Sequence, residues 1–141
     1  NSQQVLFLDS EYNVPNYKDD AGIDLYCDSD GIIKSFETIR MKTKHKIFLP
    51  KGYYATVHPR SSTAMKGIIV HATVIDSRYT GEIFIVVSNI KNEAFKYLQN
   101  DRLAQIIISK KIQTKLQVLS SDQFNLLSSD RNENGFGSTG R

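Results

Sequence analysis

The chain has 141 residues, a length that predicts one domain. Its hydrophobic residues (40%) and charged residues (23%) occur in the proportions of an ordinary globular protein, which excludes a disordered or fibrous chain. No apolar run approaches the roughly 20 residues that span a bilayer, and the first residues lack the pattern of a signal peptide, so we expect a soluble, intracellular protein of the cytoplasm or nucleus. The net charge of +3 indicates an anionic partner, but the sequence contains no nucleic-acid-binding module, and we expect the lysine-rich residues 42–46 to be solvated surface.

Short segments rich in β-branched and aromatic residues alternate with turn residues along most of the chain. They predict strands at residues 5–8, 32–33, 47–49, 53–58, 83–87 and 103–108, with turns at 51–52 and 89–93 and a connection at 97–101. Only residues 61–66 predict a short helical turn, with Ser61 or Ser62 as its N-cap. The expected fold is therefore all-β, a jelly-roll-like barrel.

Residues 21–26 begin a strand after a turn and carry the first polar side chain of interest, Asp24. Its carboxylate either pairs with a basic group or reaches a metal-bound water, and pairing is the commoner role. Cys27 follows directly and is the only cysteine, so no internal disulfide can form and a reducing compartment is favoured. We interpret Cys27 as a small buried apolar residue rather than a nucleophile.

Residues 59–67 place Arg60, Ser61 and Ser62 immediately after a predicted strand, at the start of the helical turn. Exposed amide groups there, beside a guanidinium, would hold phosphate oxygens. The alternative is an ordinary capped turn with Arg60 in a structural ion pair, and this segment taken alone favours that alternative.

Residues 74–82 put Asp76 at the end of an apolar strand, three residues before Tyr79. This spacing predicts a hairpin with Asp76 near its base. Asp76 either fills an ordinary turn position or orients a water as general base, with Tyr79 packed against a sugar ring.

Two further segments complete the set. Gln105 lies in the predicted strand after Asp101 and either bonds to the backbone or donates its amide to a phosphate.

The chain becomes polar after Leu119, and residues 135–140 combine glycines, two hydroxyls and one aromatic ring, which suits either a lid or an ordinary linker. We predict a barrel domain over residues 1–127 and a flexible arm over residues 128–141 that closes over the site.

Taken in order, the five segments resemble the five motifs of the trimeric dUTPase family, and the resemblance covers the chain from Val5 to its last residue. Residues 21–25 resemble the first motif, 59–62 the second, 74–76 with Tyr79 and Gly81 the third, 102–105 the fourth and 135–140 the fifth. One such match arises easily by accident, whereas five in the family's order do not.

The resemblance implies hydrolysis of dUTP to dUMP and pyrophosphate by attack of water on the α-phosphorus, in a homotrimer whose active sites are shared between subunits. Asp76 would activate the water, Tyr79 would lie under the deoxyribose and exclude a 2′-hydroxyl, and Phe136 would stack on uracil. Uracil would be read largely through the backbone of Val70, Thr73, Val74 and Ile75 and around Phe84. The implied phosphate-binding residues are Arg60, Ser61, Ser62, Gln105, Arg131, Gly137, Ser138 and Thr139.

The resemblance also implies Mg²⁺ as cofactor, held by the phosphates and waters, with Asp24 in reach of it only through water. The activity would limit uracil incorporation into DNA and supply dUMP for dTMP synthesis. The chain departs from the family at Ala72 and Thr73, where glycines are usual, and this affects the fit around uracil. Ser62 and Asn132 replace two other frequent glycines without removing a charge.

Two other functions compete with this one. A dCTP deaminase has a related fold but needs a glutamate suited to deamination of cytosine, whereas the arrangement of Asp76 and Tyr79 favours phosphohydrolysis. A dUTPase-like binding or signalling protein that has lost catalysis is the second alternative, and the presence of Asp76, Tyr79, Arg131 and Phe136 argues against it.

Overall fold

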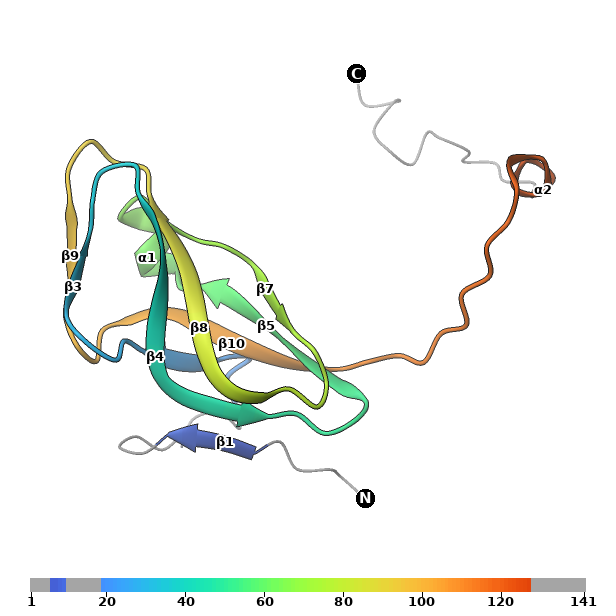
Figure 1. The fold of residues 1–141 in the computed structure, drawn as a ribbon, viewed down its shortest axis with the longest axis horizontal. Helices are drawn as coiled ribbons and strands as arrows, with labels where there is room; N and C mark the ends of the chain where they lie inside the picture. Colours follow the sequence, from blue (N-terminus) through green and yellow to red (C-terminus); the bar gives the residue numbers. More distant parts are fainter. Residues whose placement is uncertain (1–5, 10–18, 128–141) are drawn as a thin grey trace.

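The structure, a computed structural model, describes the backbone of residues 6–9 and the whole of residues 19–127. These residues form strands and two short helices (Figure 1), a composition that confirms the all-β expectation. The elements are β1 (Leu6–Asp9), β2 (Ile23–Tyr26), β3 (Gly31–Ile33), β4 (Thr38–Phe48), β5 (Tyr53–Pro59), α1 (Ser61–Met65), β6 (Ile68–Val70), β7 (Thr73–Ile75), β8 (Thr80–Asn89), β9 (Phe95–Tyr97), β10 (Arg102–Lys110) and α2 (Ser121–Asn125).

The strands form two four-stranded sheets and a separate ribbon. Sheet A has the order β1-β4-β8-β6, sheet B has the order β2-β10-β5-β7, and β3 pairs with β9 in the ribbon. Neighbouring strands of the described residues are antiparallel. The two sheets face each other across one apolar core (Figure 1), which is the arrangement of a jelly-roll-like barrel.

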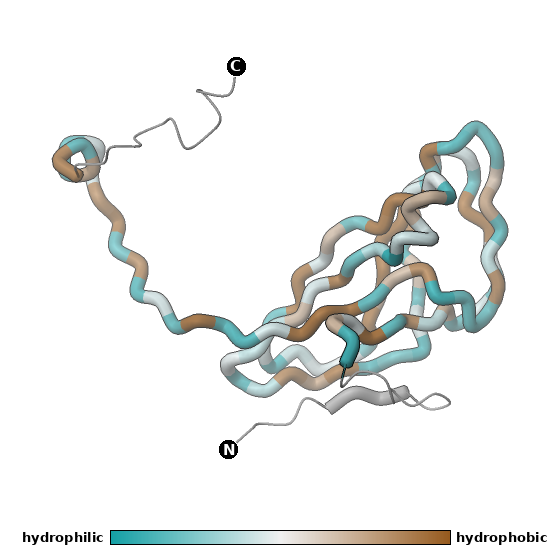
Figure 2. The backbone as a smooth tube through the Cα atoms, turned by 180° about the vertical axis from the view of Figure 1, so that it is seen from behind, coloured by the Kyte–Doolittle hydropathy of each residue, from teal (hydrophilic) through white to brown (hydrophobic). Residues whose placement is uncertain are grey.

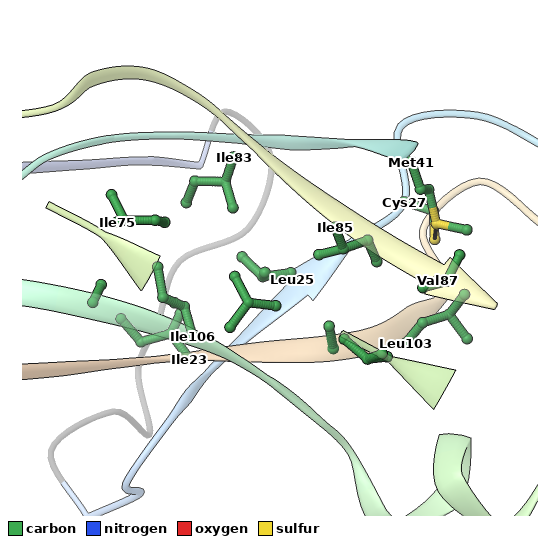
Figure 3. Packing of buried hydrophobic residues seen from close by; sticks show 14 of the residues in the cluster. Ile23, Leu25, Cys27, Met41, Ile75, Ile83, Ile85, Val87, Leu103 and Ile106 are labelled. Atoms are coloured by element: carbon green, nitrogen blue, oxygen red, sulfur yellow. Dashed lines mark hydrogen bonds between the residues drawn. The ribbon is translucent and has the colours of Figure 1, made fainter. Parts of the chain in front are cut away.

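Alternate residues of the strands point into this core. Along β2, β5 and β8 every second side chain is buried, and Figure 3 shows Leu25 of β2, Ile85 of β8 and Ile106 of β10 meeting between the sheets. This period of two is that of a strand with one face in the core and one face outside. The opposite faces therefore carry the polar side chains that are available for chemistry.

The lysine-rich residues 42–46 belong to β4 and are not simply solvated surface. Thr43 and His45 point inward and are 3% and 0% exposed, while their lysine neighbours point outward. The Thr43 hydroxyl donates to Ile83 O at 2.5 Å, and His45 Nε2 accepts from Tyr26 N at 2.9 Å. These bonds satisfy polar groups that would otherwise be costly to bury, so the strand tolerates a sequence that looks like surface.

Cys27 is 1% exposed, and its Sγ contacts Met41 Sδ at 3.2 Å (Figure 3), which confirms the buried role expected for it. Burial, and secondarily the charge of Asp101, raise the pKa of the Cys27 thiol to about 12. A thiol of this kind is protonated at neutral pH and is a poor nucleophile.

The helix α1 is present, but its expected capping is wrong. Arg60 is the N-cap residue, and no side chain caps the helix. The Thr63 hydroxyl, buried at 1% exposure, donates to Leu103 O at 2.8 Å and so fixes α1 to β10. A second helix, α2, was not expected; it begins with a capping box formed by Ser120 and Gln123.

The chain leaves sheet B after Lys110 and runs away from the barrel as an extended segment, as Figures 1 and 2 show. Residues 111–120 belong to no strand, and Ile112, Leu116 and Val118 are 79%, 90% and 86% exposed. The predicted arm over residues 128–141 lies outside the described residues. None of the described helices has the length and apolar character needed to cross a membrane.

Candidate functional site

Three of the five motif segments meet on the outer face of sheet B. Asp24 of β2 is the register partner of Gln105 of β10, so both side chains leave the sheet on the same side. Arg60 follows β5 directly, and β5 is the other neighbour of β10. The sheet thus brings together residues that lie up to 81 positions apart in the chain, Asp24 and Gln105.

Asp24 is the centre of this group and pairs with two arginines. Its Oδ1 lies 3.2 Å from Arg60 Nε, and its Oδ2 lies 3.4 Å from Arg102 Nη1. Arg60 Nη1 also donates to Arg102 O at 3.0 Å. The ion-pair role expected for Asp24 is therefore observed, and Arg102 of the fourth motif segment is its second partner. Asp24, Arg60, Arg102 and Gln105 are called the Asp24 cluster below.

Gln105 is held in the Asp24 cluster by the backbone and by a close glycine. Its Nε2 donates to Pro59 O at 3.1 Å. A Cβ added at Gly22 would collide with Gln105 Oε1, so the absence of a side chain at residue 22 lets the amide lie where it does. Of the two roles that the sequence left open for Gln105, the structure contains the backbone bond, and its acceptor oxygen faces residue 22.

Ser61 and Ser62 are the first two residues of α1 and are exposed beside Arg60. Neither side chain caps the helix, so both hydroxyls are available on the surface next to the Asp24 cluster. Their position results from the Thr63 bond to β10 described above.

Asp76 and Tyr79 lie in a turn of residues 76–79 between β7 and β8, called the Asp76 turn below. Tyr79 N donates to Asp76 O at 3.2 Å, and Arg78 adopts a positive φ of 70° with its N donating to Leu49 O at 2.7 Å. Tyr79 Oη donates to Glu82 O at 2.6 Å, which fixes the ring close to Gly81. Asp76 itself is exposed.

The predicted hairpin around Asp76 is wrong. β7 pairs with β5 in sheet B, whereas β8 pairs with β4 and β6 in sheet A, so the Asp76 turn carries the chain from one sheet to the other. Local sequence predicts that two strands are joined by a tight turn but does not specify that the strands pair with each other. Partners distant in sequence decide the pairing here.

The Asp76 turn and the Asp24 cluster lie at opposite ends of sheet B within one chain. Ile75 pairs with Ala55 near the start of β5, while Arg60 follows the last residue of β5. Five residues of extended strand between them correspond to about 17 Å. In Figure 1, β5 ends beside α1 at one end of the barrel, and the turn between β7 and β8 lies at the other end. A single chain therefore does not bring Asp76 to Arg60.

The residues assigned to uracil occupy different environments. Val70 and Ile75 are core residues with 6% and 8% exposure, Val74 is 63% exposed, and Thr73 is half-buried. Thr73, Val74 and Ile75 form β7, an edge strand that pairs only with β5 among the described strands. Phe84 lies on the outer face of sheet A.

Arg40 covers Phe84, with its Cζ 4.3 Å from the ring centroid. This cation–π contact engages the Phe84 side chain within its own sheet. Arg131, Phe136, Gly137, Ser138 and Thr139 lie outside the described residues.

The dUTPase family model matches residues 9–140 of the chain. The chain belongs to the dUTPase family. It is 36% identical over 146 residues to the deoxyuridine 5'-triphosphate nucleotidohydrolase of Fusobacterium nucleatum, an alignment that covers 99% of this chain and 97% of that protein. The rat protein of the same name is 38% identical over 122 residues, and there the match spans 86% of this chain but 58% of the rat protein.

A solved dUTPase structure from Staphylococcus bacteriophage 80alpha shares the fold. It superposes with a TM-score of 0.81 over 98% of this chain and 99% of that chain, at 20% sequence identity. At this identity the likeness establishes architecture only, and it agrees with the jelly-roll-like barrel expected from the sequence. The named relatives of this dUTPase-family chain are nucleotidohydrolases, so the expectation that it belongs to a family of hydrolases is confirmed.

Proposed function

We propose that the chain hydrolyses dUTP to dUMP and pyrophosphate. The observation that carries the proposal is the Asp24 cluster with Ser61 and Ser62 beside it. The second and fourth motifs present there two guanidinium groups, two hydroxyls and an amide. Such a group suits the oxygens of a triphosphate. The curated relatives at 36% and 38% identity are nucleotidohydrolases of deoxyuridine 5'-triphosphate.

In the proposed complex Arg60 binds phosphate while it keeps its bonds to Asp24 and to Arg102 O. A guanidinium has five N–H donors, and Arg60 uses Nε toward Asp24 and Nη1 toward Arg102 O. The remaining donors are available for phosphate oxygens, while Asp24 fixes the orientation of the guanidinium plane. Ser61, Ser62 and Gln105 add neutral hydrogen bonds beside it.

Asp76 acts as the general base in the proposed reaction. Its exposed carboxylate accepts a proton from a water that attacks the α-phosphorus in line with the leaving pyrophosphate. The Tyr79 ring, held by its bond to Glu82 O, lies under the deoxyribose and leaves no room for a ribose 2′-hydroxyl. The selection of the sugar is thus steric.

We further propose that the active site is shared in a homotrimer. The separation of the Asp76 turn from the Asp24 cluster supports this, since a second copy of the chain is needed to supply Asp76 to Arg60. The extended segment after Lys110 supports it as well, because Ile112, Leu116 and Val118 are spaced like the apolar face of a strand and are more than three-quarters exposed. A neighbouring copy would cover them.

Mg²⁺ is the proposed cofactor, bound through the phosphates and waters. Among residues 19–127, no three His, Cys, Asp or Glu side chains gather to hold a metal ion. Asp24 fits a contact through water, because each of its oxygens holds one arginine and retains a lone pair for a further donor. The ion, when bound, neutralises phosphate charge.

Uracil is proposed to be read by the free edge of β7, through Thr73, Val74 and Ile75, and by the backbone at Val70 and around Phe84. Backbone groups on that edge have no strand partner among the described residues, so they suit the donors and acceptors of a base. Phe136 would stack on the base, while Arg131, Gly137, Ser138 and Thr139 of the arm would close over the phosphates. The product would supply dTMP synthesis, and removal of dUTP would limit uracil in DNA.

Release of pyrophosphate from dUTP, compared with dCTP, dTTP and UTP with and without Mg²⁺, tests the activity. We expect turnover of dUTP in the presence of Mg²⁺ and little turnover of the other nucleotides. A preference for UTP over dUTP would contradict the role of Tyr79, and release of ammonia from dCTP would identify a deaminase instead.

Mixing two inactive variants tests the shared site. Arg60→Ala and Asp76→Asn each disable one contribution, so neither homotrimer is active. If one copy supplies Arg60 and another supplies Asp76, random reassembly of equal amounts restores about a quarter of wild-type activity. No recovery after verified subunit exchange would place both residues in one chain's site and reject sharing.

A further inference from the structure

Four cationic residues from separate parts of the chain lie around the Asp76 turn. They are Lys51, Arg78, Lys110 and Lys111, and all four are exposed. Figure 1 shows the connection between β4 and β5, the turn between β7 and β8 and the end of β10 at the same end of the barrel. These four residues are called the basic edge below.

A backbone hydrogen bond joins the Asp76 turn to the connection between β4 and β5. Arg78 N donates to Leu49 O at 2.7 Å, and Lys51 follows Leu49 by two residues. Arg78 belongs to the same β-turn as Asp76, and the ends of such a turn lie within about 7 Å of each other. The backbones of Arg78 and Lys51 therefore lie close to that of Asp76.

Lys110 and Lys111 approach the same connection from the other side of β5. Lys110 is the register partner of Tyr53, and Lys111 N donates to Gly52 O at 2.8 Å. Because β10 and β7 flank β5, residues at corresponding positions on them are about 10 Å apart. The Debye length is about 30 Å at 0.01 M salt and about 8 Å at 0.15 M. At low ionic strength all four charges therefore act on an anion near Asp76, and at 0.15 M salt much of this attraction is screened.

The charges of the basic edge are not neutralised by neighbouring carboxylates. Within residues 19–127, none of its four side chains forms an ion pair. Glu82, on the strand that follows the turn, is paired with Lys42 Nζ at 3.4 Å. Asp76 is thus a single carboxylate among four cations, and the charge around the proposed base is positive.

The conformation of Arg78 supports a role for its side chain. Its φ is 70°, in the left-handed region that glycine and asparagine adopt readily and arginine does not. Such strain persists where neighbouring contacts fix the backbone, here the bond to Leu49 O, and it occurs more often at functional sites. An asparagine would suit this backbone better, so the turn alone does not explain an arginine.

We propose that the basic edge attracts the triphosphate of dUTP to the shared site by long-range electrostatics. A surface of one sign of charge raises the association rate of an oppositely charged ligand by about 10–10³-fold, and salt weakens the effect. The Asp24 cluster of another copy then holds the nucleotide that the basic edge has attracted. This inference rests on the proposed function, because it assumes that Asp76 meets dUTP.

The dependence of kcat/KM on ionic strength tests the proposal. In Lys110→Gln/Lys111→Gln, we expect kcat/KM for dUTP about fivefold below wild type at about 0.01 M salt and within about twofold of it at about 0.15 M. We expect kcat within about twofold of wild type, because these charges make no contact with the bound nucleotide.

Lys34→Gln/Lys96→Gln is the matched control. It removes the same charge from exposed residues at the β3–β9 ribbon, at the other end of the barrel (Figure 1), so kcat/KM should stay within about twofold of wild type at both salt concentrations. Equal losses in the two double variants, or a loss in Lys110→Gln/Lys111→Gln that salt does not reduce, would overturn the proposal.

Two replacements of Arg78 separate its charge from the structure of the turn. Arg78→Lys keeps the charge, so kcat/KM should stay close to wild type. Arg78→Asn removes the charge and suits the positive φ, so we expect kcat/KM to fall at low ionic strength while Tm is no lower than that of wild type. If kcat/KM and Tm of Arg78→Asn both fell, and salt did not reduce the loss of kcat/KM, Arg78 would serve the turn and not the basic edge.

Binding of inorganic tripolyphosphate separates this inference from the proposed function. In calorimetric titration without Mg²⁺ at about 0.01 M salt, Lys110→Gln/Lys111→Gln should bind tripolyphosphate about threefold more weakly than Lys34→Gln/Lys96→Gln. If wild type fails to hydrolyse dUTP but this difference is present, the proposed function fails and the basic edge still attracts phosphates. If dUTP is hydrolysed and the two double variants behave alike in both assays, the inference on the basic edge fails alone.

Discussion

The Asp24 cluster and the Asp76 turn both lie on sheet B, yet the chain builds them to very different degrees. In the cluster, Asp24 pairs with two arginines, and Gln105 is bonded to Pro59 O. In the turn, backbone bonds fix Tyr79 and Arg78, while the Asp76 side chain is exposed. The half proposed to bind phosphate, the Asp24 cluster, is therefore preformed within one chain. The half proposed to activate water, the Asp76 turn, presents its carboxylate outward, as the proposed sharing between copies requires.

The largest expected effect comes from a substitution of Asp76 in the Asp76 turn. Asp76→Asn keeps the size and the turn conformation but removes the base, and a positioned base typically contributes about 10²–10⁴-fold to the rate. We expect kcat to fall by that order and KM for dUTP to change little, because the Asp24 cluster is untouched. Steady-state pyrophosphate release measures both constants. Near-wild-type kcat would remove Asp76 from the mechanism.

Substitutions of Tyr79 test whether the Asp76 turn selects deoxyribose over ribose. Tyr79→Ala removes the ring that would exclude a ribose, and we expect the ratio of kcat/KM for dUTP over UTP to fall by roughly tenfold to a hundredfold. Tyr79→Phe is the matched control: it removes only the hydroxyl bonded to Glu82 O and keeps the ring. An unchanged ratio in the alanine variant would mean that the ring does not select the sugar.

The sequence predicted the central strands better than the way in which they pair. Apolar alternation identified the central strands, because burial on one face imposes a period of two. It failed on β4, where buried Thr43 and His45 sit among lysines, and at residue 89, which was expected in a turn. Asn89 is fully buried and donates to Ile33 O and Glu93 O, and these partners are invisible to local sequence.

The candidate site shows the same division. The sequence carried a signal that Asp24 pairs with a basic group but not with which one, and its partners in the structure are Arg60 and Arg102. The crossing of the Asp76 turn between sheets left no such signal. Strand partnership is set by contacts across the whole core, so residue types near a turn do not determine it.

Gly22→Ala tests the Asp24 cluster, and its expected effect is smaller than those of the substitutions of Asp76 and Tyr79. The added Cβ collides with Gln105 Oε1, so the amide must move away from Pro59 O, while the Asp24 ion pairs stay in place. We expect KM for dUTP to rise by roughly threefold to tenfold and kcat to remain close to wild type, since the lost contact is one hydrogen bond to phosphate. Gly52→Ala is the control for loss of a glycine, because a Cβ there meets nothing within 4 Å, although its φ of 92° costs some stability. An unaltered KM in Gly22→Ala would show that Gln105 does not contact the substrate.

The smallest expected effect concerns the core beneath the cluster. Cys27 directly follows β2, the strand that carries Asp24, and burial raises its pKa from 9.0 to about 12. The unfolded thiol ionises first as pH rises, so the stability contributed by the protonated buried thiol is complete below about pH 9 and is lost progressively toward pH 12. Between pH 9 and pH 11, Tm of the wild type should therefore fall by roughly 5 °C more than Tm of Cys27→Ala, which has no thiol to ionise. Groups that titrate in both proteins cancel in this difference. Parallel Tm curves would mean that ionisation of the thiol costs the folded chain nothing, and that the core under the preformed half is more open to water than 1% exposure indicates.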